Sequence, residues 1–285
     1  MIKILSPGLY CTIQDMGRVG YRKQGVPVSG AMDQFSAELA NRLVGNKPNT
    51  PLLEATLNGP TLQFLQTTQI AITGAHFTPS IDGIKIPMNS RYIVSEGGIL
   101  KFYQVLYGAR VYIAVAGGIM TEYVLGSASA YQGITEGAPL VKGDALATTP
   151  SIENSTEGSF SGVKVARSYF EAEEIEVFAG PEFTKLSAEI RDTLTTTHFT
   201  ITSESNRMAY TLEASKDLSA NEILTAPVQP GTVQLTPSGK IVVLMRDAQT
   251  TGGYARVLQL TSESVNRLAQ KRARSFIRFR LISYP

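Results

Sequence analysis

Short apolar runs separated by glycine and proline dominate this 285-residue chain, which contains 25 Gly and 14 Pro. Runs that alternate in polarity, or stay apolar over a few residues, are typical of β-strands, and the turn-forming residues between them leave little room for long helices. Such runs occupy residues 69–73, 99–102, 111–116, 175–178 and 241–245. The sequence therefore predicts a mainly β fold.

Three segments have helical spacing instead. The first follows Asp33, a good N-cap, carries apolar side chains four residues apart and stops at Gly45. The other two lie at 183–194 and 262–269. We therefore expect only a few short helices.

Residues 148–161 are rich in Ser, Thr, Gly and Glu without periodicity, which is typical of an exposed connection. We place one subdomain at 1–155 and a second at 162–285. Residues 98–118 and 231–253 share the order of a strand, a glycine turn, an apolar strand and a Gly-Gly loop. This order is consistent with two related β units and also with chance recurrence of glycine turns.

Composition excludes several classes of function. The formal net charge is only +2, too small to attract nucleic acid or anionic lipid over the whole surface, and no apolar stretch could span a bilayer. Cys11 is the only cysteine, and only His76 and His198 could supply imidazole, so we expect no metal site. No P-loop sequence is present. We expect a cytoplasmic protein.

Two polar, glycine-containing stretches, residues 14–33 and 247–254, are the candidates for chemistry. Polar residues packed among glycines are typical of loops where the backbone approaches a ligand, although tight structural turns give the same pattern. Arg18 could clamp a carboxylate or phosphate, and Asp15 could orient it or act as a base. The second stretch could direct backbone amides at an anion or an oxyanion.

A series of motifs extends over nearly the whole chain. They are Gln14-Asp15-Met16-Gly17-Arg18-Val19-Gly20, Gly25 to Asp33, Ala40 to Asn46, Leu53 to Pro60, Thr73-Gly74-Ala75, Ala114 to Gly118, Leu125-Gly126-Ser127, Ser205 to Met208, Pro230 to Gln234 and Asp247 to Tyr254. Taken together, these motifs resemble the KipA-like carboxyltransferase family, which includes the C subunit of 5-oxoprolinase, allophanate hydrolase subunit 2 and part of urea carboxylase.

The resemblance implies tandem cyclophilin-like β-barrels and a role in a multi-subunit enzyme. The implied reaction opens 5-oxo-L-proline to L-glutamate at the expense of ATP, with Mg²⁺, bound in the complex. Phosphorylating the lactam oxygen would convert a poor electrophile into an activated one. The implied partners are the KipI-like and LamB-like subunits, which are the B and A subunits of 5-oxoprolinase, with a small-molecule substrate and neither nucleic acid nor membrane.

The site residues follow from the same motifs. We predict catalytic roles for Asp15, Arg18 and Asp247. The predicted substrate-binding residues are Gln14, Ser29, Asp33, Asn206, Arg207, Gln249, Thr250, Thr251 and Tyr254. For each loop, a purely structural turn is the alternative.

Two other functions remain open. One family branch is linked to control of a sporulation kinase, so the chain could be a regulatory protein that binds and antagonises a KipI-like kinase inhibitor. The family commonly has Thr where this chain has Ala130, Arg where it has Thr211 and Glu where it has Ala226. The loss of these polar groups would suit such a role. The last alternative is a component of allophanate hydrolase or urea carboxyltransferase, for which the chain has no biotin-attachment Met-Lys-Met.

Overall fold

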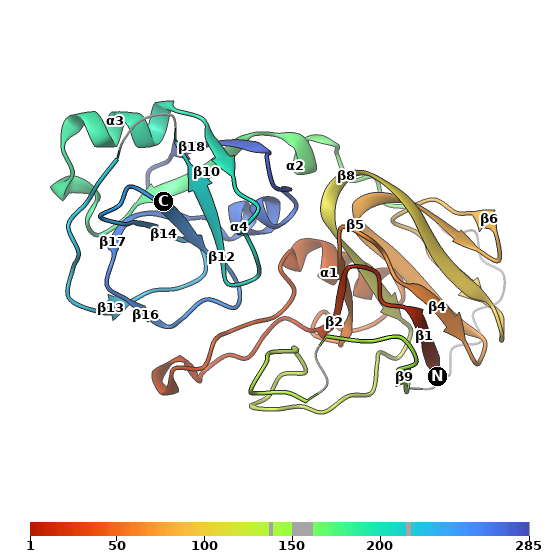
Figure 1. Cartoon of the computed structure of the whole chain (residues 1–285). Coiled ribbons are helices and arrows are strands. Elements are labelled where there is room, and N and C mark those ends of the chain that lie inside the picture. The colour runs from red at the N-terminus through yellow and green to blue at the C-terminus, as the bar shows by residue number, and fades with distance from the viewer. Residues whose placement is uncertain (137–138, 150–161, 215–217, 285) are drawn as a thin grey trace. The chain divides into compact units, whose positions relative to one another are not determined.

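The computed structural model describes residues 1–136, 139–149, 162–214 and 218–284 (Figure 1). The chain forms two compact units. The N-terminal unit comprises Met1–Arg18 and Asp33–Phe170, and the C-terminal unit comprises Val19–Met32 and Glu171–Pro285. The predicted break between residues 155 and 162 lies outside the described residues and stays a prediction. No sequence pattern indicates that residues 19–32 belong to the C-terminal unit.

The N-terminal unit contains a nine-stranded sheet. Its path runs β2-β3-β8-β4-β1-β9, and β5 pairs with β6, β7 and β8. The strands are β1 (Ile2–Ser6), β2 (Tyr10–Gln14), β3 (Leu52–Thr56), β4 (Thr61–Phe64), β5 (Thr68–Ile81), β6 (Ile84–Lys85), β7 (Arg91–Val94), β8 (Ile99–Val115) and β9 (Ala145–Leu146). The unit buries an apolar cluster that includes Ile4, Phe64, Ile72 and Ile113.

The strand β8 corrects one expectation. Residues 99–102 and 111–116 were predicted as separate strands around a turn at Gly108, but β8 is continuous over 17 residues. Gly108 does take a positive φ of 79°. Across Gly108 the pairing with β5 shifts register between Gly74↔Val111 and His76↔Tyr107, so a β-bulge absorbs the irregular backbone without reversing the chain.

The C-terminal unit contains a closed barrel with the order β10-β17-β14-β15-β12-β11-β18. The parallel pair of β10 and β18 closes it. Its strands are β10 (Glu174–Ala179), β11 (Phe199–Ile201), β12 (Ala209–Glu213), β14 (Thr232–Leu235), β15 (Ile241–Leu244), β17 (Ala255–Leu260) and β18 (Phe276–Leu281). A separate two-stranded ribbon joins β13 (Ala226–Pro227) and β16 (Thr251–Gly252).

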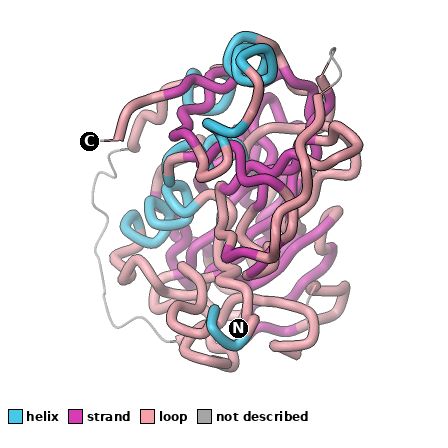
Figure 2. Tube along the Cα trace, turned by 90° about the vertical axis from the view of Figure 1, so that its left-hand side faces the viewer, coloured by secondary structure: helices cyan, strands magenta, loops and turns pink. Residues whose placement is uncertain are grey.

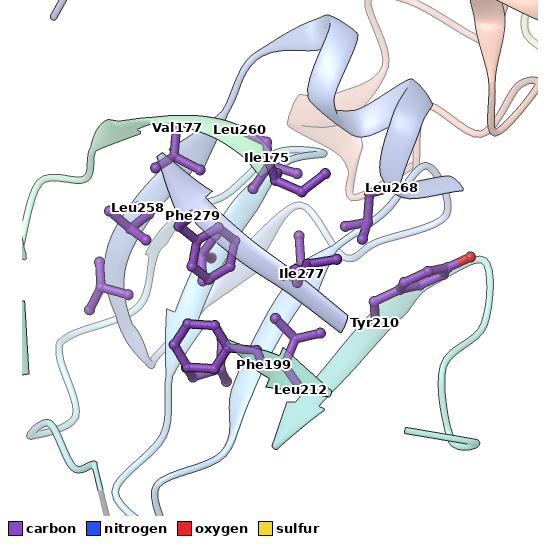
Figure 3. Packing of buried hydrophobic residues seen from close by; sticks show 14 of the residues in the cluster. Ile175, Val177, Phe199, Tyr210, Leu212, Leu258, Leu260, Leu268, Ile277 and Phe279 are labelled. Carbon is purple, nitrogen blue, oxygen red and sulfur yellow. The ribbon is translucent and has the colours of Figure 1, made fainter. Parts of the chain in front are cut away.

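The barrel interior is filled by the alternate side chains of its strands. Figure 3 shows Ile175, Phe199, Leu258, Ile277 and Phe279 converging from four of the strands. All five are almost completely buried. β14 and β15 form the hairpin predicted around Gly239, whereas the corresponding N-terminal segment is one strand. The proposed sequence echo therefore does not describe a shared structure.

The helices are short, as expected (Figure 2). They are α1 (Gln34–Leu43), α2 (Ser168–Glu171), α3 (Ala188–Thr196) and α4 (Ser262–Ala269), with 3-10 turns η1 (Arg22–Gln24) and η2 (Phe183–Lys185). The helix predicted at 183–194 is split into η2 and α3, because Leu186 is extended and the Ser187 side chain caps Ile190 N. The mainly β prediction with few helices is confirmed: a half-barrel sheet and a closed barrel.

None of the helices within the described residues has the length and apolar character needed to cross a membrane.

Candidate functional site

Asp15 follows β2 and anchors a buried hydrogen-bond network in the N-terminal unit. Its Oδ1 accepts from Gly17 N at 2.7 Å, Ser127 Oγ at 2.7 Å and Ser129 Oγ at 2.5 Å. Its Oδ2 accepts from Ala128 N at 2.7 Å. The residue is only 2% exposed. Four donors already occupy the carboxylate, so its direct effect is to hold residues 127–129 against the Gly17 turn.

Arg18 and Gln14 are tied to the same loops. Arg18 is 1% exposed, and its Nη2 donates to Ser129 O at 2.6 Å. The Gln14 amide nitrogen donates to Thr12 Oγ1 at 3.0 Å, while its buried Oε1 has no hydrogen bond to a described residue. The predicted residues Gln14, Asp15 and Arg18 are therefore brought together, but with side chains turned inward.

Asp33 is the N-cap of α1 and belongs to a second buried network. Its carboxylate accepts from Ser36 N at 3.1 Å, Ser36 Oγ at 2.6 Å and Tyr169 Oη at 2.8 Å. Tyr112 Oη accepts from Asp33 N at 2.8 Å and donates to Glu54 Oε2 at 2.9 Å. Burial, followed by the charges of Glu54 and Asp33, raises the pKa of Tyr112 well above its ordinary value. These contacts hold the Asp33 side chain at the start of α1, and its role in substrate binding stays a prediction.

A surface hollow of about 510 Å³ lies beside the Asp15 turn. It is lined by Lys47, Asn49, Thr50, Pro51, Gly117, Ile119, Met120, Thr121, Tyr123 and Thr149. Asn49 Oδ1 accepts from Met16 N at 2.9 Å and so connects the hollow to the turn. Sequence reasoning missed these residues, although the 40–46 and 114–118 motifs lead directly into the hollow.

In the C-terminal unit, Arg207 and Asp247 form a forked ion pair. Arg207 Nε donates to Asp247 Oδ2 at 2.8 Å and Nη2 to Oδ1 at 3.1 Å. Nη2 also donates to Gly30 O at 2.7 Å. The pair stands where β12 begins and β15 ends, because Ala209 pairs with Leu244. Both oxygens of the Asp247 carboxylate thus accept from Arg207. The bond from Arg207 to Gly30 O joins the 19–32 segment to the barrel.

Ser29 and Asn206 shape the backbone around this pair. Ser29 is fully buried with φ of 55°, and its N donates to Arg246 O at 2.8 Å. Its Oγ has no hydrogen bond to a described residue. Asn206 Oδ1 accepts from Met208 N at 2.8 Å and closes a local turn. Both residues are built into turns, and Ser29 is left-handed without being glycine, which is uncommon.

The 249–254 loop differs from these networks because its polar side chains are not held by hydrogen bonds to described residues. No hydrogen bond joins the side chains of Gln249, Thr250, Thr251 or Tyr254 to a described residue, while Thr250 O accepts from Val228 N at 3.0 Å. Thr251 is exposed and Tyr254 is 40% exposed. Of the predicted residues, these four have polar groups available for a ligand.

Gln234 was quoted within a motif but not assigned a role. It lies in β14, is 1% exposed, and its amide nitrogen is buried without a hydrogen bond to a described residue. A glutamine between two apolar residues, Val233 and Leu235, was the available signal.

The part of the chain that the structure describes offers no ready site for a metal ion. Within 1–136, 139–149, 162–214 and 218–284, no group of three or more His, Cys, Asp or Glu side chains is placed to hold one. Cys11 is buried, and desolvation, followed by the charge of Glu54, raises the pKa of its thiol to about 12. The available chemistry is therefore that of amides, hydroxyls and guanidinium groups.

This combination defines a mainly β protein whose polar loops are held by hydrogen-bonded carboxylates. The chain belongs to the carboxyltransferase domain family, subdomain A and B, which it matches over residues 24–281.

Two of its relatives are C subunits of 5-oxoprolinase. The one from Escherichia coli (strain K12) is 36% identical, with 95% of this chain and 87% of that protein covered. The one from Haemophilus influenzae is 34% identical, with 99% and 92% covered.

Two solved structures are similar over almost the whole chain. The crystal structure of TTHA0988 has a TM-score of 0.86 and 31% identity, and covers 98% of this chain. The match spans 55% of that protein, so this chain corresponds to about half of it. The K. lactis urea amidolyase structure has a TM-score of 0.86 and 27% identity, with 99% of this chain and 19% of that protein covered.

Proposed function

We propose that this chain is a subunit of an ATP-dependent 5-oxoprolinase, which converts 5-oxo-L-proline, ATP and water to L-glutamate, ADP and phosphate. The observation that carries the proposal is the similarity to the C subunits of two 5-oxoprolinases. It extends over 87% of one and 92% of the other, so little of either relative is left unmatched.

The proposal includes two partners. The relatives are named as one lettered subunit of 5-oxoprolinase, which implies an enzyme of several subunits. We therefore propose a KipI-like subunit and a LamB-like subunit as the other parts, and we expect the isolated chain to be inactive.

The proposal assigns no residue of this chain to the nucleotide. The sequence has no P-loop, and the described residues include no acidic cluster suited to Mg²⁺. ATP with Mg²⁺ would be bound in the complex. Its hydrolysis would supply the driving force for opening a stable lactam.

The contacts divide the predicted site residues by role. Asp15, Arg18 and Asp247 are proposed as positioning residues rather than as groups that touch substrate, because hydrogen bonds within the protein engage each of them. Gln249, Thr250, Thr251 and Tyr254 are proposed as substrate contacts, because their side chains are uncommitted. Hydroxyl and amide groups of this kind suit a carboxylate and a lactam carbonyl.

Reconstitution tests the proposal. The chain is mixed with a KipI-like and a LamB-like partner, and glutamate release from 5-oxo-L-proline is followed with and without ATP. The expected result is release that requires all three proteins and ATP. Release that continues when this chain is omitted would refute its role as an enzyme subunit. Binding to the KipI-like partner without turnover would favour the regulatory function instead.

A second candidate is a component of urea carboxyltransfer. The observation that favours it is the match of 99% of this chain to the K. lactis urea amidolyase. Replacing 5-oxo-L-proline by urea, with a biotin carboxylase system supplied, distinguishes the two reactions in the same assay.

A further inference from the structure

The side chain of Gln234 is the least explained polar group of the barrel. It is 1% exposed, and its Nε2 is buried without a hydrogen-bond partner among the described residues. Its Oε1 accepts no hydrogen bond from the described part of the chain either. An unsatisfied buried amide costs about 1–3 kcal/mol. Packing alone therefore gives no reason for a glutamine here.

The strand pattern places this amide on the outer face of the barrel. Val233 and Leu235, on either side of Gln234, belong to the interior cluster. Since successive side chains of a strand point to opposite faces, Gln234 points outward. Its partner Val242 lies on that face, beside a small apolar cluster of Val228, Leu244 and Ala248. These side chains offer the amide no polar partner.

The β13–β16 ribbon covers the amide. A Cβ added to Gly252 would lie 2.6 Å from Gln234 Nε2, so the absence of a side chain at Gly252 leaves room for the carboxamide. Only two residue pairs, Ala226↔Gly252 and Pro227↔Thr251, form the ribbon. Leu224, just before it, is 94% exposed. Thin, weakly buried elements of this kind open at low free energy.

Hydrogen bonds at the ribbon and its flanks hold it in place. Ile223 N donates to Gly253 O at 2.9 Å and Val228 N to Thr250 O at 3.0 Å, while Arg256 Nη1 donates to Pro227 O at 3.2 Å and Arg22 Nη2 to Val228 O. The ribbon also carries the uncommitted hydroxyl of Thr251 and leads to that of Tyr254. Opening the ribbon would expose the N–H donor and the C=O acceptor of the Gln234 amide near the hydroxyl groups of Thr251 and Tyr254.

We propose that Gln234 is the floor of a binding site for a small cis-amide, either a lactam or a urea, and that the β13–β16 ribbon is its lid. A primary carboxamide presents one N–H and one C=O along the same edge. A lactam or a urea presents the complementary C=O and N–H in the cis arrangement, so two parallel hydrogen bonds can form. A trans peptide bond can make only one of them. This inference rests on the proposed function, because it identifies the substrate group that the chain would recognise.

The test uses the full chain with selectively ¹⁵N-labelled glutamine and follows the Gln234 side-chain NH₂ signal, assigned by its loss in Gln234→Met. The probes are 2-pyrrolidinone, 5-oxo-L-proline and urea, with N-methyl-2-pyrrolidinone as the matched control that lacks the N–H. The expected result is a saturable shift with the first three probes and binding at least about tenfold weaker for the control, as the loss of one or two hydrogen bonds predicts.

A structural role predicts different behaviour, which the variants separate. Gln234→Met should keep or raise the thermal midpoint while abolishing lactam binding, because it removes an unpaired amide. Gln259→Met is the control: Gln259 donates to Pro230 O at 3.0 Å and accepts from Thr232 Oγ1 at 2.9 Å, so this change should lower the midpoint without affecting binding.

The inference is overturned if no lactam or urea shifts the Gln234 signal, or if Gln234→Met binds the probes as the wild type does. This titration needs neither partner nor ATP. A failure of 5-oxoprolinase reconstitution alongside a lactam- or urea-dependent shift would therefore reject the proposed reaction while retaining the site.

Discussion

Replacing Asp15 by Asn tests whether this residue is structural. The carboxylate accepts four hydrogen bonds, two from backbone N–H groups and two from serine hydroxyls, at 2.5–2.7 Å. Asn can keep an acceptor on the Oδ1 side only, so its NH₂ would face the N–H of Ala128. Losing that bond and weakening three charge-assisted ones should lower the free energy of unfolding by about 3–5 kcal/mol.

Urea unfolding at neutral pH measures this loss. Asp144→Asn is the control, because Asp144 Oδ2 accepts a single bond, from Val141 N at 2.8 Å, and should lose only about 1 kcal/mol. The reasoning fails if Asp15→Asn remains within about 1 kcal/mol of the wild type in stability but loses activity in the reconstituted complex. In that case the carboxylate would act on the substrate, as the sequence motif first indicated.

Other buried groups make three more expectations testable. Desolvation, then the charge of Arg267, lowers the pKa of Lys271 to about 8, below its ordinary 10.5. Between these pH values the unfolded chain binds the extra proton, so stability should rise with pH there by at most about 3 kcal/mol. Unfolding of wild type and Lys271→Met across this window checks it, and parallel curves would contradict it. Cys11, with a pKa of about 12, should resist thiol reagents in the native protein and react on unfolding; stoichiometric native labelling would count against its burial. Arg207→Met should lower stability by about 3 kcal/mol, with little further loss on adding Asp247→Asn. If the stability losses of Arg207→Met and Asp247→Asn, each measured alone, add up in the double variant, the two side chains do not interact.

Local signals were sufficient for part of the fold. Asp33 as N-cap and the four-residue spacing after it identified α1, because a cap is encoded within a few residues. The face that α1 buries was not identified: Ser36, Ala37, Ala40 and Asn41 are buried, whereas Phe35 is exposed. The continuity of β8 through Gly108 was not accessible in this way, because a bulge against β5 decides it. The return of residues 19–32 to the C-terminal unit likewise depends on distant contacts, such as Arg207 with Gly30.

The sequence located candidate site residues without their hydrogen-bond partners. Dense glycines and polar residues marked Asp15 and Asp247 correctly as unusual. Their partners decide what they do, however, and Ser127 lies 112 residues from Asp15 while Arg207 lies 40 residues from Asp247. Gln234 is the opposite case. The sequence assigned it no role, and it stands out in the structure because its buried Nε2 has no hydrogen-bond partner among the described residues.

The assignment of residues 19–32 to the C-terminal unit means that the two units cannot be separated by one cut in the gene. A fragment beginning at residue 162 would lack Met32, a member of the barrel's own apolar cluster. It would also lack the Gly30 carbonyl that accepts a hydrogen bond from Arg207. During synthesis, the ribosome releases residues 19–32 long before the barrel that needs them. Recombination or fusion that exchanges one unit must therefore carry this segment along, and shuffled genes that break after residue 161 should yield poorly folded barrels.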